Sequence, residues 1–104
     1  RKDNIINSGG IKIQIEEVEE RLRPYLDRPY AITAAPDPRL GEAVVLLLAS
    51  NLRGEMLTEV LASLPKYLRP RHIIKVSEIP QTGSGKIDRA ACRELARNII
   101  TKTL

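Results

Sequence analysis

The hydrophobic and polar positions near the start of the chain predict a β-hairpin. Residues 5–7 are strand-like, and the pair Gly9-Gly10 follows them. Between residues 11 and 15, isoleucines at every second position alternate with polar residues. A period of two is typical of a half-buried strand, and glycines tolerate the positive φ angles of a tight turn. We therefore expect two short antiparallel strands joined at the glycine pair.

Three stretches show the spacing of three and four that is typical of an amphipathic helix. Their apolar positions are Ile15, Val18 and Leu22; Leu57, Val60, Leu61 and Leu64; and Ile87, Ala91, Leu95 and Ile99. The first opens with carboxylates, which suit the positive end of a helix dipole, and Pro24 limits its length. The last follows Asp88, whose side chain is a candidate N-cap.

The remaining apolar segments predict three strands. Residues 30–35 read as a strand and are followed by a turn-rich segment at 36–42. Residues 43–50 are continuously apolar, which is typical of a central strand covered on both faces. Residues 73–79 predict a third, longer strand. The expected fold class is therefore α+β, with an N-terminal two-stranded hairpin followed by a three-stranded sheet flanked by helices.

Composition limits the class of protein. The 104 residues suit one compact domain, and a formal net charge of +4 mildly favours an anionic ligand. No apolar run approaches the roughly 20 residues of a membrane span. A lone Cys92 excludes an internal disulfide and fits a reducing compartment, so we expect a cytoplasmic protein. Because "RKDN" reads like the middle of a turn, residues 1–104 are expected to be a fragment of a longer chain.

Three stretches combine residue types that can carry chemistry. The loop "PQTGSGKIDR" (80–89) presents a single lysine, Lys86, beside glycines, but it lacks the spacing of a phosphate-binding P-loop. A lysine on a flexible loop could neutralise charge on a phosphate or a carboxylate. Taken alone, each stretch is better explained without a function: the lysine loop as a solvated turn, "NSGG" (7–10) as a simple hairpin, and "RKDN" (1–4) as a charged turn.

Taken together, the stretches resemble a known family. "RKDNIINSGGIKIQIEEVEERL" resembles the pattern G-R-x-D-x-x-I-x-x-G-G-x-x-I-x-x-x-E-[IV]-E without its leading glycine, and "PQTGSGKIDR" resembles P-x-T-x-S-G-K-[IV]-x-R. "PDPRLGE" and "YLRPRHI" match further family features in the same order. From residue 1 to about residue 95, the chain resembles the C-terminal domain of the adenylate-forming superfamily, which includes acyl-CoA synthetases, nonribosomal peptide adenylation domains and luciferases.

The resemblance implies an ATP-dependent acid:CoA ligase that forms an acyl-adenylate and then transfers the acyl group to a thiol. A larger N-terminal domain of the same chain is implied as the partner that binds ATP with Mg²⁺ and a small carboxylic acid. The C-terminal domain would rotate between the two half-reactions. CoA and ATP would be substrates of the full-length enzyme, and we expect the fragment alone to bind neither and to be inactive.

The resemblance also implies roles for individual residues. Lys86 matches the lysine that enters the adenylation site, Asp3 the hinge, and Arg1 an arginine near the nucleotide. The residues implied to line the CoA tunnel are Ser8, Gly9 and Gly10, and those implied to shape the lysine loop are Gly83, Ser84 and Gly85. No metal ligands are implied. Glu17 and Arg89 match motif positions that we interpret as structural.

A narrower resemblance is to o-succinylbenzoate:CoA ligases of menaquinone synthesis, since "NSGG" is more similar to aryl- and acyl-CoA ligases than to peptide synthetases. Asn7 and Ile15 depart from the residues that are frequent at these family positions. The acid itself cannot be inferred, because the family's substrate pockets lie in the N-terminal domain. The acceptor is likewise left open between CoA and a carrier-protein thiol.

The sequence also leaves two alternative functions open. A basic α+β nucleic-acid-binding module is one alternative, although the chain has no Phe or Trp for base stacking. A stand-alone interaction domain without activity is the other. His72 is expected at a strand edge, Cys92 in the core, and "EEVEERLR" (16–23) on a solvated helix face.

Overall fold

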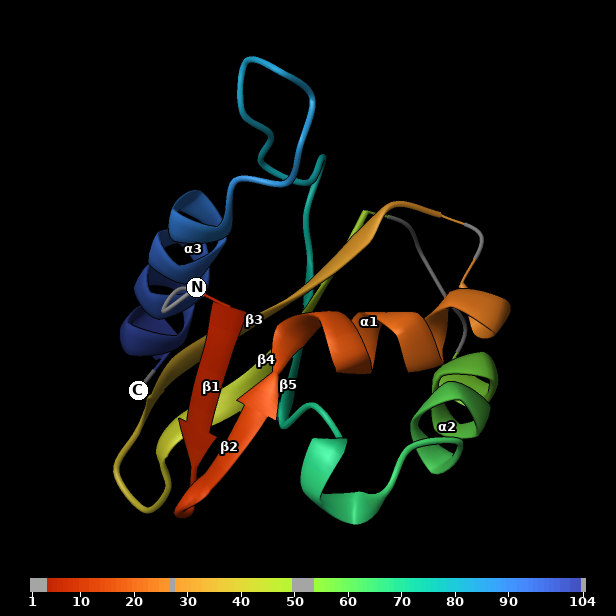
Figure 1. Cartoon of the computed structure of the whole chain (residues 1–104), viewed down its shortest axis with the longest axis vertical. Coiled ribbons are helices and arrows are strands. Elements are labelled where there is room, and N and C mark those ends of the chain that lie inside the picture. Colours follow the sequence, from red (N-terminus) through yellow and green to blue (C-terminus); the bar gives the residue numbers. More distant parts are fainter. Residues whose placement is uncertain (1–3, 27, 50–53, 104) are drawn as a thin grey trace.

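The computed structural model describes residues 4–26, 28–49 and 54–103. In chain order, its strands and helices are β1 (Ile5–Ser8), β2 (Ile11–Gln14), α1 (Ile15–Leu22), the 3₁₀ turn η2 (Arg23–Tyr25), β3 (Tyr30–Asp37), β4 (Gly41–Leu48), α2 (Gly54–Ala62), the 3₁₀ turn η3 (Lys66–Leu68), β5 (His72–Lys75) and α3 (Arg89–Thr103) (Figure 1).

The strands form one five-stranded sheet organised around β4. β3 pairs with β4 in antiparallel fashion along its whole length, from Tyr30 opposite Leu48 to Asp37 opposite Gly41. The other edge of β4 is shared, because Ser8 of β1 pairs with Gly41 and β5 runs parallel to the opposite half of the strand. The predicted α+β class and the N-terminal hairpin are confirmed, and the hairpin is joined to the main sheet.

β4 is buried on both faces, as its continuous apolar run predicts. Val44, Leu46 and Leu48 belong to a core shared with α1 and α2. Val45 and Leu47 belong to a second core under α3. Figure 1 shows α3 on one side of the sheet and α1 on the other. The central strand therefore supports two helical layers.

Two details of the sheet differ from the sequence prediction. The expected strand at 73–79 pairs only over His72–Lys75, because β4 ends at Leu48 and offers no further partners beyond a hydrogen bond from the Val76 N–H to the Leu48 carbonyl. The second strand of the hairpin, predicted over residues 11–15, also ends early, at Gln14. Ile11 is 45% exposed, and Ile15 is buried as the first residue of α1.

The buried face of α3 is one residue away from the predicted one. Cys92, Ala96 and Ile100 are buried, whereas the predicted positions Ile87, Ala91, Leu95 and Ile99 are partly buried at its margins. The contact between α3 and the sheet is made by small side chains, since β3 presents alanines to the helix. Burial raises the pKa of the Cys92 thiol to about 11, which fits the predicted core role. The predicted cap is confirmed, because Asp88 Oδ1 accepts the Ala91 N–H at 3.0 Å.

Thr33 gives a test of this core. Its side chain is 1% exposed opposite Val45, and its hydroxyl has no hydrogen-bond partner within the described part of the chain. Because an unpaired buried hydroxyl is costly, we expect Thr33→Val to raise the free energy of unfolding by about 1 kcal/mol in urea titrations. Thr33→Ser keeps the hydroxyl and removes a methyl group, so it should destabilise. A valine variant less stable than the natural protein would contradict this account.

Candidate functional site

Lys86 lies on a closed hairpin rather than on a loose loop. The Thr82 N–H donates to the Lys86 carbonyl at 2.7 Å, and the Gly85 N–H donates to the Thr82 carbonyl at 3.0 Å. One step further out, Gln81 pairs with Ile87 as an antiparallel bridge. The hairpin projects from the body between β5 and α3 (Figure 1). These backbone bonds restrict the flexibility that the glycines suggested.

The three residues at the tip of this hairpin differ in what they require. Gly85 has a φ of 83°, a left-handed conformation that favours glycine, as in a three-residue hairpin loop. The Ser84 hydroxyl lies 3.0 Å from the Thr82 hydroxyl, within hydrogen-bonding distance. Gly83 has no positive φ, and a β-carbon there would meet no atom within 4 Å. The backbone geometry therefore requires glycine at Gly85 and not at Gly83.

The Lys86 side chain is exposed beside a cavity of about 420 Å³. The cavity is lined by Asn4, Glu16, Gly85, Lys86, Ile87 and Arg89. Among the described residues, none forms an ion pair with Lys86. The Asn4 amide instead engages the Glu16 carboxylate. The Lys86 ammonium is thus available to an anion that approaches the cavity from outside.

A partly buried ion pair lies at the base of the same hairpin. Arg89 Nη1 and Nη2 donate to Glu19 Oε2 and Oε1 at 2.7 and 2.8 Å, and the Ile32 N–H donates to Oε2 at 2.8 Å. The hydrogen bonds with Glu19 raise the pKa of the Arg89 guanidinium. Glu19 is 8% exposed, so the prediction that residues 16–23 form a wholly solvated face is wrong at this position.

The glycine pair forms the turn between β1 and β2. Gly9 and Gly10 have φ angles of 59° and 86°. A two-residue type I′ turn requires positive φ at both of its central residues. The Gly9 N–H donates to the Leu40 carbonyl at 2.8 Å, and a β-carbon on Gly9 would lie 3.2 Å from Leu40 Cδ2. A β-carbon on Gly10 would meet no atom within 4 Å. Gly9 therefore packs against the β3–β4 turn, whereas Gly10 faces open space.

The β3–β4 turn that supports Gly9 is itself held by a carboxylate. Asp37 Oδ1 accepts the N–H groups of Leu40 and Arg39 at 2.9 and 2.8 Å. These two hydrogen bonds, to Leu40 and to Arg39, lower the pKa of Asp37. The turn-rich segment predicted at 36–42 thus has a defined role, since it places Leu40 under the glycine hairpin.

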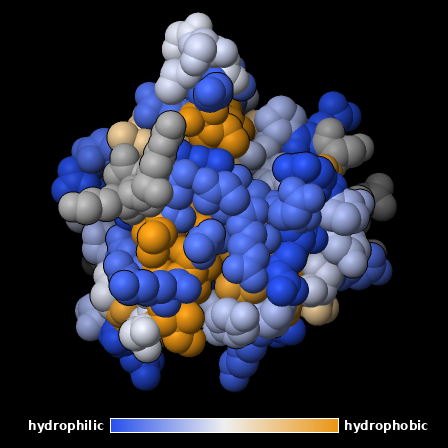
Figure 2. Space-filling model, viewed as in Figure 1, coloured by the Kyte–Doolittle hydropathy of each residue, from blue (hydrophilic) through white to orange (hydrophobic). Residues whose placement is uncertain are grey.

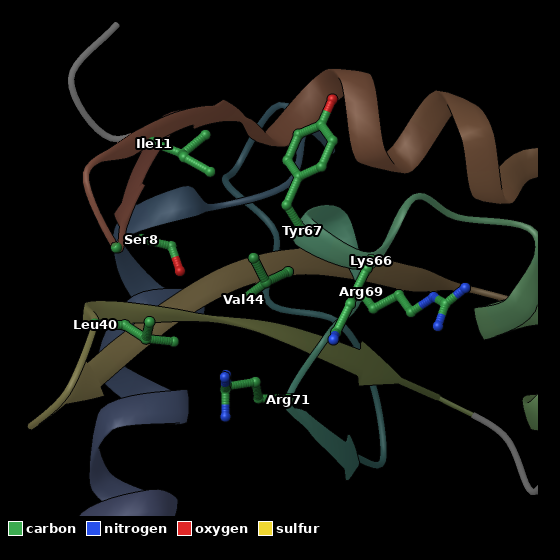
Figure 3. Close-up of a pocket in the computed structure, with 9 residues that line it drawn as sticks. Ser8, Ile11, Leu40, Val44, Lys66, Tyr67, Arg69 and Arg71 are labelled. Carbon is green, nitrogen blue, oxygen red and sulfur yellow. The ribbon is translucent and has the colours of Figure 1, made fainter.

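A pocket of about 430 Å³ opens beside the glycine turn. Its lining is Ser8, Gly9, Ile11, Leu40, Val44, Lys66, Tyr67, Arg69 and Arg71. In Figure 3, Ser8, Ile11 and Leu40 lie at the left of the pocket, and Lys66 and Arg69 lie at the right. On the face drawn in Figure 2, apolar surface lies over the β1–β2 hairpin beside hydrophilic surface over α1. The pocket therefore combines apolar walls with three cationic side chains.

Sequence reasoning did not select the cations of this pocket. "KYLRPRH" was matched only as a family feature, although it contains Lys66, Arg69 and Arg71 within six residues. The 3₁₀ turn η3 and hydrogen bonds from Arg69 Nε to the Leu64 carbonyl and from the Arg71 N–H to the Val44 carbonyl hold this segment in place. The density of basic residues around a tyrosine was the signal that could have indicated an anion site.

The structure brings some predicted residues together and separates others. Ser8 and Gly9 share one pocket, whereas Gly85 and Lys86 line another. The two hairpins project from opposite ends of the sheet (Figure 1). Arg1 and Asp3 lie outside the described residues, so their predicted roles rest on the resemblance.

Within residues 4–26, 28–49 and 54–103, no group of three or more His, Cys, Asp and Glu side chains could hold a metal ion. His72 is the first residue of β5 and is partly buried, as expected of a strand edge. No helix in the described part of the chain is long and apolar enough to cross a membrane.

Comparisons with known proteins identify the family of the chain. A sequence profile described as "AMP-binding enzyme C-terminal domain" matches residues 28–86. Triostin synthetase I of Streptomyces triostinicus is 33% identical over an alignment of 102 residues that covers 92% of this chain and 19% of that protein. The 2-succinylbenzoate–CoA ligase of Lactococcus lactis is 35% identical over an alignment of 89 residues that covers 84% of this chain and 20% of that protein.

A solved structure shares the fold along the whole chain. The crystal structure of the acyl-CoA synthetase of Brucella canis matches with a TM-score of 0.77 and 32% sequence identity. The match covers 100% of this chain and 20% of the Brucella chain. The chain thus spans about a fifth of the length of the curated relatives it matches.

Proposed function

Because the chain belongs to the AMP-binding enzyme C-terminal domain family of the adenylate-forming superfamily, we propose that residues 1–104 are the mobile C-terminal domain of an ATP-dependent acid:CoA ligase. The observation that carries the proposal is the presence of two cationic surfaces that could bind an anion, one at each end of the sheet. One is the Lys86 ammonium, which forms no ion pair with any described residue, and the other is the basic pocket beside Gly9. Family membership does not favour the nucleic-acid-binding alternative.

Lys86 is proposed to act in the first half-reaction. A carboxylate oxygen of the acid attacks the α-phosphorus of ATP, which enters with Mg²⁺, and pyrophosphate leaves. Charge that develops on the phosphate oxygens needs a positioned cation more than covalent chemistry. An exposed lysine on a hydrogen-bonded hairpin meets that need, because it can enter a site on the N-terminal domain and is already held in a fixed backbone geometry.

Ser8, Gly9 and Gly10 are proposed to act in the second half-reaction, in which the CoA thiolate attacks the acyl carbon and AMP leaves. The open space at Gly10 suits a slender pantetheine arm, since even a β-carbon at this position would meet no atom within 4 Å. The phosphates at the nucleotide end of CoA suit Lys66, Arg69 and Arg71. Tyr67, which is 52% exposed at the same pocket, offers a face for the adenine ring.

The pocket also bears on the acceptor thiol. A carrier protein presents phosphopantetheine without the adenine nucleotide, so it offers fewer phosphate groups than CoA to the three cations that line the same pocket as Gly9. We therefore propose free CoA as the acceptor. This choice goes beyond the sequence, which leaves the acceptor open.

The separation of the two hairpins supports a moving domain. If both serve one active site in the N-terminal domain, the C-terminal domain must turn to present each hairpin in its own half-reaction. We propose that Asp3 is the hinge and that Arg1 lies near the nucleotide, both by resemblance. We expect residues 1–104 alone to show no turnover, because the ATP and acid pockets would be absent.

The acid is proposed to be an aryl or acyl carboxylic acid, with o-succinylbenzoate of menaquinone synthesis as the first candidate and a cytoplasmic location. The Lactococcus relative with 35% identity supports this choice. The test is pyrophosphate release by the full-length protein with ATP and a panel of acids. Release with o-succinylbenzoate supports the narrow identity, and release only with another acid removes it. No release with any acid of the panel would contradict the enzyme assignment.

The basic pocket gives a separate prediction. We expect Lys66→Ala or Arg71→Ala in the full-length protein to raise the KM for CoA roughly 10-fold, because a hydrogen-bonded charge pair is lost. The KM for pantetheine, which lacks the nucleotide, should stay unchanged. Arg69 is left intact because its Nε also holds the Leu64 carbonyl.

Arg97→Ala is the matched control for this prediction, since Arg97 is an exposed cation on α3 that pairs with Glu94. It should change neither KM. Equal rises for CoA and pantetheine in the pocket variants would show that the cations do not contact the nucleotide.

A further inference from the structure

We propose that the ion pair between Glu19 and Arg89 is a positioning device that holds the Lys86 hairpin in register with the body of the domain and thereby sets the adenylation rate. The inference rests on the proposed function of Lys86. It assigns to two residues a role in catalysis that neither performs by touching a substrate.

The Glu19 carboxylate connects three elements. Both of its oxygens accept from Arg89, at the first residue of α3, and Oε2 also accepts the Ile32 N–H of β3. Glu19 itself belongs to α1, and its carbonyl accepts the Tyr30 hydroxyl at 2.7 Å. One carboxylate therefore ties the start of α3 to the sheet and to α1.

The start of α3 is also the base of the Lys86 hairpin. Only Ile87 and Asp88 separate Lys86 from Arg89. The Asp88 N–H donates to the Pro80 carbonyl at 2.9 Å, and the Asp88 side chain caps the helix. Displacement of the Arg89 backbone would therefore move the arm of the hairpin that carries Lys86.

Arg89 acts through the hairpin and not on a substrate. It lines the same cavity as Lys86, but both of its terminal nitrogens are already engaged by Glu19. The side chains of Arg89 and Glu19 are only 18% and 11% exposed, respectively. A guanidinium that is committed in this way has little capacity to bind a phosphate, whereas its fixed planar geometry suits a structural anchor.

A second ion pair on α3 shows what is particular to the first. Arg93 Nη1 donates to Glu42 Oε2 at 2.7 Å, and Nη2 donates to the Ile5 carbonyl at 2.7 Å. This pair also attaches α3 to the sheet, but one helical turn further from the hairpin. Arg93→Lys is therefore a matched control for Arg89→Lys.

The experiment is a double-mutant cycle in the full-length protein, measured by pyrophosphate release at saturating ATP and acid. We expect Glu19→Gln and Arg89→Lys each to lower kcat for adenylation roughly 10-fold, as misplacement of a catalytic group does, with the KM for ATP nearly unchanged. In a Lys86→Ala background, the same changes should cause no further loss. Transfer from pre-made acyl-adenylate to CoA should be unaffected.

Two results would overturn the inference. One is a loss of the same size with and without Lys86, which would mean that the pair only supports the fold. The other is an equal loss of adenylation in Arg93→Lys when the variants are compared at the same fraction folded. Unchanged adenylation in Glu19→Gln and Arg89→Lys would overturn it as well.

Hydrogen exchange separates this inference from the proposed function. In Glu19→Gln, the amides of Thr82 and Gly85 should exchange at least several-fold faster than in Arg93→Lys, because they close the hairpin. If they do not, the anchoring role is wrong whatever the activity shows. If Lys86→Ala leaves adenylation intact, the proposed function and the effect on rate both fall, and exchange alone decides whether the pair holds the hairpin.

Discussion

Replacing Lys86 by alanine in the full-length protein is expected to lower the rate of adenylation roughly 10²–10³-fold, the usual loss when one preorganised charge contact is removed. Transfer of the acyl group from pre-made acyl-adenylate to CoA should stay within about 2-fold of the natural rate, because the pocket proposed to bind CoA lies at the other end of the sheet. The two half-reactions are measured separately, as pyrophosphate release and as CoA thioester formation.

Lys75→Ala is the matched control for this prediction. Lys75 is an exposed lysine at the end of β5 that lines neither the Lys86 cavity nor the pocket beside Gly9, and its loss should change neither half-reaction. If Lys86→Ala behaves like Lys75→Ala, Lys86 is an ordinary surface lysine and the proposed function loses its catalytic residue. If both half-reactions fall together, the two ends of the domain do not serve separate steps.

Replacing Glu19 by alanine is expected to lower the free energy of unfolding of this domain by about 3 kcal/mol, because it leaves a partly buried guanidinium, with a side chain only 18% exposed, without its counter-charge. The Ile32 N–H would lose its acceptor at the same time. Urea unfolding of the full-length protein, followed by hydrogen exchange at the Ile32 amide, measures the loss where it should be largest.

Glu17→Ala is the matched control on the same helix. Glu17 pairs with Arg21 at 3.6 Å, and both side chains are about half exposed. Exposed i,i+4 pairs contribute little, so the loss should be no more than about 0.5 kcal/mol. Similar losses in the two variants would mean that water screens Glu19 as it does Glu17, and the buried-pair account would fail.

The contrast between these two glutamates shows the limit of sequence reasoning. "EEVEERLR" predicts a helix correctly, but it offers no sign that one of its four glutamates is buried. The reason is that Glu19 is buried by a partner 70 positions away. Likewise, the buried stripe of α3 depends on which face β3 can approach closely, and the length of β5 depends on where β4 ends.

The basic pocket is a second example. Its lining comes from the glycine hairpin, the β3–β4 turn, β4 and the segment around η3, and no local pattern predicts that these four meet. The cations were visible in the sequence as residues, but not as a cluster around apolar walls. Only the pairing of β1 and β5 with the same edge of β4 brings them beside Gly9.

By itself, the sequence determined the features that depend on neighbours along the chain. These are the central strand, from its continuous apolar run; the N-terminal hairpin, from glycines that adopt positive φ; and the cap at Asp88, from a side chain within reach of its own helix. Through a motif, it also indicated Lys86 as a candidate catalytic residue. The tertiary structure alone decided which glutamate is buried, which cations share a pocket and how far apart the two hairpins lie, because these depend on contacts between residues distant in sequence.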